Sequence, residues 1–180
     1  MTMTEGAVDP RFPVGRFRVE GEIGADERAA WIEQIAQTPA RLREAVAGLS
    51  DAQLDTPYRD GGWTVRQVVH HLPDSHLNAY TRVKLGLTET DPVIKPYDEG
   101  AWALLDDSRD TPVEVSLTLL EALHARWVVL LRSLPDDAWS RTVQHPENGR
   151  MRLDYVLGLY AWHGRHHVAH VTGLRERMGW

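Results

Sequence analysis

The sequence has no cysteine among its 180 residues. This absence excludes a disulfide framework, a cysteine-ligated zinc or iron–sulfur centre and a thiol nucleophile, so a metal would have to bind through His, Asp or Glu. No apolar run approaches the ~18 residues that suggest a membrane span, and the first seven residues lack the basic and apolar regions of an export signal. We therefore expect a cytoplasmic protein that has no membrane partner.

Basic residues are scarce relative to acidic ones. Lys and Arg number 20 against 26 Asp and Glu, which gives a net charge of -6. Proteins that follow nucleic-acid phosphates need a basic surface, so nucleic acid is not an expected partner. The sequence also lacks a phosphate-binding glycine loop, a dinucleotide-binding fingerprint and a Gly-x-Ser-x-Gly motif. The length and the 42% hydrophobic content suit a single domain over residues 1–180.

Hydrophobic periodicity predicts an all-α fold with small extended additions. Residues 16–23 alternate apolar and charged side chains, which predicts a short strand within an extended N-terminal segment, residues 1–24. Longer periods predict helices over about 26–49, 65–87, 112–134 and 153–177. Two helix pairs of this kind would form a four-helix bundle. Asn148-Gly149 could turn a small hairpin, and residues 88–110 form a long polar loop with a short turn near 102–105.

Local signals mark the helix starts and two irregular points. Thr64 and Gln67 have the spacing of a capping box, and Thr111-Pro112 is a cap followed by proline at the first helical position. Pro39 should kink or split the first helix. Pro73 should remove the hydrogen bond to the Val69 carbonyl and bend the helix over 65–87, beside a group of histidines.

Seven of the nine histidines fall in two short windows, each on a predicted helix. They are His70, His71 and His76 in the first window and His163, His166, His167 and His170 in the second. Helical residues four apart lie on the same face, close enough for two imidazoles to bind one cation. On a helical wheel, His163 and His167 lie nearer the centre of the apolar stripe than His166 and His170, so they form the inward pair.

On the helical wheel for residues 65–87, only one of the three histidines faces the centre of the apolar stripe. His76 lies near the middle of the apolar stripe, whereas His70 and His71 fall on opposite flanks. A single inward histidine is commonly a core residue that hydrogen-bonds a neighbour. Two inward histidines four apart, facing a second histidine-rich helix, favour a metal site in the bundle core.

Several short motifs together resemble the YfiT-like branch of the DinB superfamily, from about Asp26 to the C-terminus. They are Gly62-Trp63-Thr64, His70-His71-Leu72, Asp74-Ser75-His76, Pro96-Tyr97-Asp98-Glu99, Ala101-Trp102, Gly158-Leu159-Tyr160, Trp162-His163, His166-His167 and Met178-Gly179-Trp180. The resemblance implies an up-down-down-up four-helix bundle, a homodimer, and one divalent metal per chain, zinc first and nickel second. It implies His71, His163 and His167 as the ligands; for His71 the assignment comes from the resemblance alone.

Three chemical roles remain open for such a site. Three neutral imidazoles leave at least one coordination position open, where a metal lowers the pKa of a bound water towards ~7 or binds a thiolate. The resemblance therefore implies a metal-dependent hydrolase acting on a small molecule, or a transferase that uses a low-molecular-weight thiol such as bacillithiol. The third role is non-enzymatic: a bundle in which metal only stabilises the fold, or which binds a ligand in its apolar cleft.

The sequence singles out no catalytic base. His-Glu-x-x-His is missing, because Gly164 and Arg165 follow His163. Asp74, Asp98 and Glu99 have suitable chemistry but are more typical of solvated carboxylates. We assign no cofactor-binding residue other than the three metal ligands.

Overall fold

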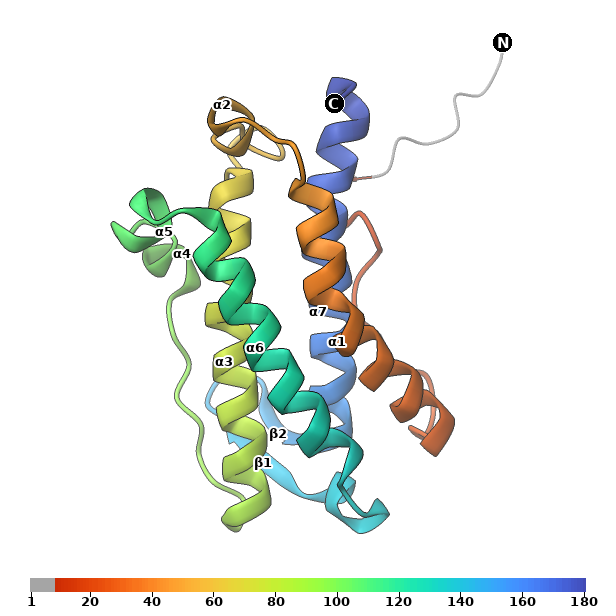
Figure 1. Cartoon of the computed structure of the whole chain (residues 1–180). Helices are drawn as coiled ribbons and strands as arrows, with labels where there is room; N and C mark the ends of the chain where they lie inside the picture. Colours follow the sequence, from red (N-terminus) through yellow and green to blue (C-terminus); the bar gives the residue numbers. More distant parts are fainter. Residues whose placement is uncertain (1–8) are drawn as a thin grey trace.

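Four long helices pack into a bundle in the computed structural model, which describes residues 9–180 (Figure 1). The long helices are α1 (Ala25–Val46), α3 (Val65–Thr88), α6 (Val113–Arg132) and α7 (Leu153–Met178). The short elements are α2 (Asp51–Leu54), α4 (Glu99–Trp102), α5 (Asp107–Asp110), the 3₁₀ helix η1 (Asp136–Ser140), β1 (Thr142–His145) and β2 (Gly149–Arg152).

The bundle has the expected up-down-down-up topology. In Figure 1, α1 and α7 run upwards while α3 and α6 run downwards. Helix α1 packs on α7 and α6, and α3 packs on α6 and α7, so each long helix has two long-helix neighbours. None of the helices within residues 9–180 is long and apolar enough to cross a bilayer.

The predicted start of α3 is confirmed in detail. The backbone amide of Gln67 donates to the Thr64 hydroxyl at 3.1 Å, and the Thr64 amide donates to the Gln67 side chain at 3.0 Å. This reciprocal pair satisfies two amides that the first helical turn leaves free. Helix α6 begins one residue later than expected: Pro112 occupies the N-cap, and no side chain caps this helix.

Two buried prolines lie inside long helices without ending them. Helix α1 continues through Pro39 to Val46, so of the two predicted outcomes, a kink or a split, the split does not occur. Helix α3 continues through Pro73 to Thr88. Each proline lacks an amide hydrogen and therefore leaves the carbonyl four residues earlier without its helical partner.

The apolar core consists of two clusters along the bundle axis. One surrounds Ile35, Trp127 and Leu157, and the other surrounds Leu72 and Leu120. On α7, the first cluster ends at Ala161 and the second includes Val171, so the histidines of this helix lie between them. The bundle therefore holds its polar groups in a layer between two apolar regions.

The predicted N-terminal strand over residues 16–23 does not form. The segment has no regular secondary structure, but Phe17, Val19 and Ile23 are partly buried while the charged residues between them are exposed, as the alternation predicts. Phe17 packs edge-on against Trp31 and Tyr155 of the helices. A strand needs a hydrogen-bonded partner strand, and this segment lies against helices instead.

The predicted hairpin does form, before α7. Strands β1 and β2 pair antiparallel, with Val143 opposite Met151. Gly149 has φ 73°, the left-handed conformation that glycine adopts without a Cβ penalty. Val143 and Met151 are buried in the core, so the hairpin closes one end of the bundle beside α7.

Candidate metal centre

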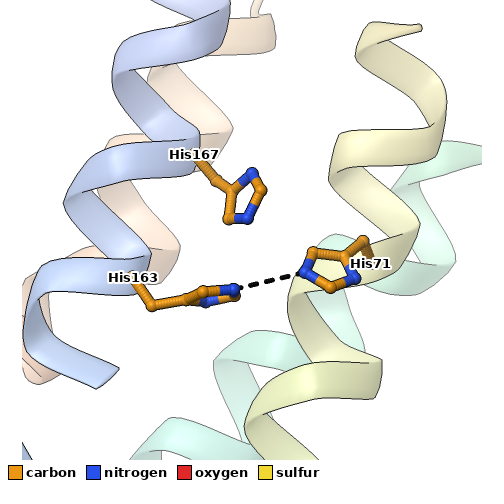
Figure 2. Close-up of side chains that lie close together, drawn as sticks. All are labelled: His71, His163 and His167. Atoms are coloured by element: carbon orange, nitrogen blue, oxygen red, sulfur yellow. Dashed lines mark hydrogen bonds between the residues drawn. The ribbon is translucent and has the colours of Figure 1, made fainter. Parts of the chain in front are cut away.

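Three imidazoles converge between α3 and α7: His71, His163 and His167 (Figure 2). One ring nitrogen from each lies within 4.8 Å of the other two. Nε2 of His71 is 3.2 Å from Nε2 of His163. The structure thus brings together the three histidines that the sequence predicts as ligands.

Helical geometry accounts for the placement of the two α7 residues. His163 and His167 are one turn apart, and both project towards α3 in Figure 2. His71 reaches the same point from the facing helix and is buried. A straight-helix wheel places His71 at the edge of the stripe, but packing against α7 makes that edge an interior position.

His76, which periodicity favours, is buried more deeply than His71 and lies outside the cluster of three. It has 0% exposure, and its Nε2 is 3.1 Å from Nδ1 of His163. Its other ring nitrogen, Nδ1, is 2.8 Å from Nε2 of His124 on α6. The wheel was right that His76 faces inward; it could not show that the side chain meets a neighbouring histidine.

Burial keeps the three clustered rings neutral. It lowers the pKa of His71 to about 4. For His163 and His167, burial and the surrounding histidines hold the pKa well below the ordinary value. Neutral imidazoles are the form that binds metal, so these rings need not lose protons to act as ligands at neutral pH.

A cavity of about 910 Å³ opens onto the cluster. Trp63, Tyr97, Tyr160 and Arg82 line it together with the three histidines. Burial raises the pKa of Tyr97 to about 12 and also raises that of Tyr160, so both phenols stay protonated at neutral pH. The Arg82 guanidinium donates to the Tyr160 hydroxyl at 3.3 Å. The cavity therefore places hydrogen-bond donors beside the candidate ligands.

The three candidate carboxylates occupy different positions. Asp98 and Glu99 line the cavity, at the start of α4 and within the long loop predicted over residues 88–110. Asp74 is not among the lining residues. Partial burial and the nearby Asp107 raise the pKa of Asp74 to about 6. Position alone therefore favours the loop carboxylates over Asp74.

His166 and His170 are more buried than the wheel predicts. Their exposures are 8% and 4%, because segments outside the bundle cover them. Tyr58, which precedes α3, stacks on His170 with ring centroids 4.0 Å apart, and Phe12 of the N-terminal segment lies over His166 with ring centroids 6.4 Å apart. The sequence held no spacing signal for these contacts, since a wheel describes one helix and not the loops that fold over it.

His124 is the functional candidate that the sequence reasoning missed. It lies on α6, away from both histidine windows, and is 2% exposed. A lone histidine on an apolar helix face gives no metal-ligand spacing. Only the three-dimensional contact with His76 connects it to the site.

A family profile and individual known proteins that resemble this chain agree with one another. A profile of the DinB superfamily matches residues 34–171. "Putative metal-dependent hydrolase YfiT" of Bacillus subtilis is 50% identical over 175 residues, covering 97% of this chain and 98% of its own. A protein of Bacillus mycoides that is also named a "putative metal-dependent hydrolase" is 54% identical over 172 residues, covering 96% of this chain and 99% of its own.

Solved structures agree with the observed fold. The structure of B. subtilis YfiT, described as a probable metal-dependent hydrolase with an unusual four-helix bundle topology, superposes with a TM-score of 0.92 and covers 95% of this chain and 98% of its own. TT2238, described as a four-helix bundle protein, is 18% identical with a TM-score of 0.54 and covers 78% of this chain and 94% of its own. The second likeness shows the fold alone.

Proposed function

This chain belongs to the DinB superfamily, and from that membership and its histidine cluster we propose that it is a metal-dependent hydrolase of small molecules. His71, His163 and His167 are the proposed ligands of one divalent ion per chain, with zinc expected first and nickel second. The observation that carries the proposal is the convergence of three neutral imidazoles, from two facing helices, at the wall of a large cavity. The names of the close relatives support the same reaction class.

The donor set fits a borderline divalent metal better than a hard one. All three donors are imidazole nitrogens, which suit zinc or nickel, whereas calcium and magnesium prefer oxygen ligands. Three protein ligands are also the number found in catalytic zinc sites, while structural sites use four. When bound, such a metal supplies a Lewis acid that polarises a carbonyl and lowers the pKa of a water.

The protein's own side chains provide the rest of the proposed chemistry. The protonated phenols of Tyr97 and Tyr160 can donate to a substrate oxygen on which negative charge develops. Arg82 adds a positive charge at the same wall, held by its bonds to the Tyr160 hydroxyl and the Lys95 carbonyl. Trp63 packs against His71, with ring centroids 4.7 Å apart, and gives the cavity an apolar side.

Metal content and activity of the same preparations test this proposal. Purified protein should contain about one divalent ion per chain by elemental analysis and should hydrolyse an activated ester or amide. His163→Ala and His167→Ala should lose both metal and activity, because two ligands hold an ion far less tightly than three. His71→Ala should behave in the same way. His145→Ala, which changes a histidine outside the cluster, is the matched control and should keep its metal.

The products separate hydrolysis from the alternatives. Incorporation of oxygen from labelled water without added thiol supports the hydrolase. A thioether formed from a halo-aromatic compound and a low-molecular-weight thiol, with no hydrolysis, would instead identify a thiol transferase. Metal that protects the fold while neither reaction occurs would leave only a stabilising role.

A further inference from the structure

A buried carbonyl in α1 lacks its helical partner. In an α-helix, the carbonyl of residue 35 accepts from the amide of residue 39, but residue 39 is proline and has no N–H. Ile35 is 0% exposed, so water cannot replace that bond. The partner comes from α6 instead: Nδ1 of His124 lies 2.6 Å from the Ile35 carbonyl oxygen.

This contact fixes where the proton of His124 resides. A carbonyl oxygen can only accept, so Nδ1 of His124 must carry the hydrogen. A neutral imidazole has one donor and one acceptor, which leaves Nε2 of His124 as an acceptor. Nδ1 of His76 lies 2.8 Å from that nitrogen and must therefore be the donor.

The same donor and acceptor roles fix the hydrogen positions of His76 and His163. With its hydrogen on Nδ1, His76 accepts at Nε2, where Nδ1 of His163 lies 3.1 Å away. His163 therefore donates from Nδ1, and its Nε2 carries a lone pair. That Nε2 is the atom 3.2 Å from Nε2 of His71, marked by the dashed line in Figure 2.

The His76 and His124 rings of this hydrogen-bond chain are buried, and all of its bonds must donate in the same direction. His76 has 0% exposure and packs edge-on against Trp127 and Tyr160, while His124 is 2% exposed. An added proton on either ring would give that ring two N–H donors and no acceptor. One of its N–H groups would then point at the N–H of a neighbouring histidine. Reversal would require the Ile35 carbonyl to donate. Geometry therefore leaves a single arrangement of hydrogens.

We propose that His76 and His124 are positioning residues of the metal centre. Pro39 leaves the Ile35 carbonyl free to accept a hydrogen bond from His124, and His124 in turn accepts from His76. His76 then accepts from Nδ1 of His163, which holds the Nε2 lone pair of His163 towards His71. The proposal rests on the proposed function for the statement that the cluster binds metal. Hydrogen bonds from a ligating histidine to a second layer of groups commonly fix its tautomer and raise its basicity. Here two further histidines and a helix carbonyl serve as that layer.

Nitrogen-15 NMR of histidine-labelled, metal-free protein tests the arrangement without any substitution. The expected result is that His124, His76 and His163 all carry their hydrogen on Nδ1. Resonances are assigned by the loss of one signal set in each single variant. A hydrogen on Nε2 of any of the three would overturn the proposal.

Two substitutions at one position test the consequence for metal. His76→Gln can place its side-chain oxygen where Nε2 was and still accept from His163, whereas His76→Leu cannot accept. Competition with a chromophoric chelator should show Zn²⁺ affinity reduced about 10–100-fold in His76→Leu and largely retained in His76→Gln. The leucine variant should also lose the Nδ1–H signature of His163. Equal affinities for the two variants would overturn the proposal.

His70→Leu is the matched control on the same helix. His70 is buried at 4% exposure and hydrogen-bonds the Ser116 hydroxyl at 2.7 Å, outside the chain of histidines. This variant should leave both the His163 tautomer and the Zn²⁺ affinity unchanged, and a loss of affinity equal to that of His76→Leu would contradict a specific role for His76.

The wild-type protein separates this proposal from the proposed function. Wild type that binds Zn²⁺ but hydrolyses nothing would contradict the proposed activity alone, whereas wild type that binds no Zn²⁺ would overturn both proposals.

Discussion

The carboxylates of Asp98 and Glu99 share a cavity wall but differ in what they already bind. Oδ1 of Asp98 accepts from the Ala101 amide at 2.8 Å and so caps α4. Among the described residues, no hydrogen bond or ion pair engages the Glu99 side chain. Glu99 is therefore the freer of the two to accept a proton from an attacking water.

We predict different kinetic results for neutral replacements of these two residues. Glu99→Gln should lower kcat for ester hydrolysis by about 10²–10⁴-fold if it is the general base, with metal content unchanged. Asp98→Asn keeps a side-chain oxygen for the cap and should retain most activity. Steady-state kinetics with elemental analysis of each variant decides this. Equal rates for Glu99→Gln and wild type would leave the base unassigned and remove Glu99 from the chemistry.

At the scale of single residues, the sequence predicts the positions of side chains that recur at regular helical spacing. The four-residue step places His163 and His167 on one face of α7, and the structure brings them together. His124 could not be predicted, because its role depends on a contact between α6 and α3 and on a carbonyl in α1. The signal that was present is Pro39, which indicates a carbonyl in need of a partner four residues earlier but does not say which residue provides it.

At the scale of elements, the contact between α1 and α7 depends on glycines of α7. Gly164 lies between the two proposed ligands of this helix, and a Cβ there would be 2.6 Å from Oγ1 and 2.8 Å from Cγ2 of Thr38. Thr38 is 2% exposed, and its hydroxyl donates to the Gln34 carbonyl, so it has little freedom to move away. The close approach of the two helices thus requires a residue without a side chain.

Alanine at two glycines of α7 should therefore have opposite effects. Gly164→Ala should lower the free energy of unfolding, because overpacking costs about 1–3 kcal/mol and outweighs helix propensity. Within residues 9–180, the new Cβ of Gly173→Ala meets only Nη1 of Arg177, at 3.5 Å, so the variant should gain up to about 1 kcal/mol from helix propensity. Urea unfolding of both variants measures the difference. A stabilised Gly164→Ala would show that α1 and α7 separate easily at this point.

The accuracy of prediction for each element follows the range of the interactions that form it. Start and stop signals are local, so the capping box of Thr64 and the glycine turn at Gly149 predict an observed helix start and hairpin. The alternation over residues 16–23 correctly separates buried from exposed side chains. It fails to predict the backbone state because a strand depends on a partner elsewhere in the chain, and periodicity contains no information about that partner.

At the scale of the whole molecule, histidines make up an unusual share of the buried polar groups. Burial lowers the pKa of eight of the nine histidines: His70, His71, His76, His124, His163, His166, His167 and His170. The pKa of His124 falls to about 4 and that of His170 to about 3. The metal-free fold therefore requires these rings to stay neutral.

The direction of the resulting pH dependence follows from proton uptake. Above about pH 6.5, these histidines are neutral in both folded and unfolded chains and add no pH dependence. As the pH falls below 6.5, the unfolded chain takes up protons that the folded chain excludes, so unfolding becomes more favourable until the folded pKa values are reached, about 4 for His124. Asp74, with its pKa raised to about 6, opposes this trend by one group only.

We predict that metal-free protein loses most of its stability between pH 6.5 and about 4, where His166 also titrates in the folded state. Each histidine contributes at most about 1.4 kcal/mol per pH unit, and a domain is stabilised by only about 5–15 kcal/mol, so several acting together suffice to unfold it. Urea unfolding at pH 7.5, 6.5, 5.5 and 4.5 gives the slope. His166→Gln removes one titrating group and should reduce that slope by up to one proton. A free energy of unfolding that stays constant from pH 7.5 to 4.5 would mean that the folded protein accepts these protons, and that the histidine layer is hydrated rather than dry.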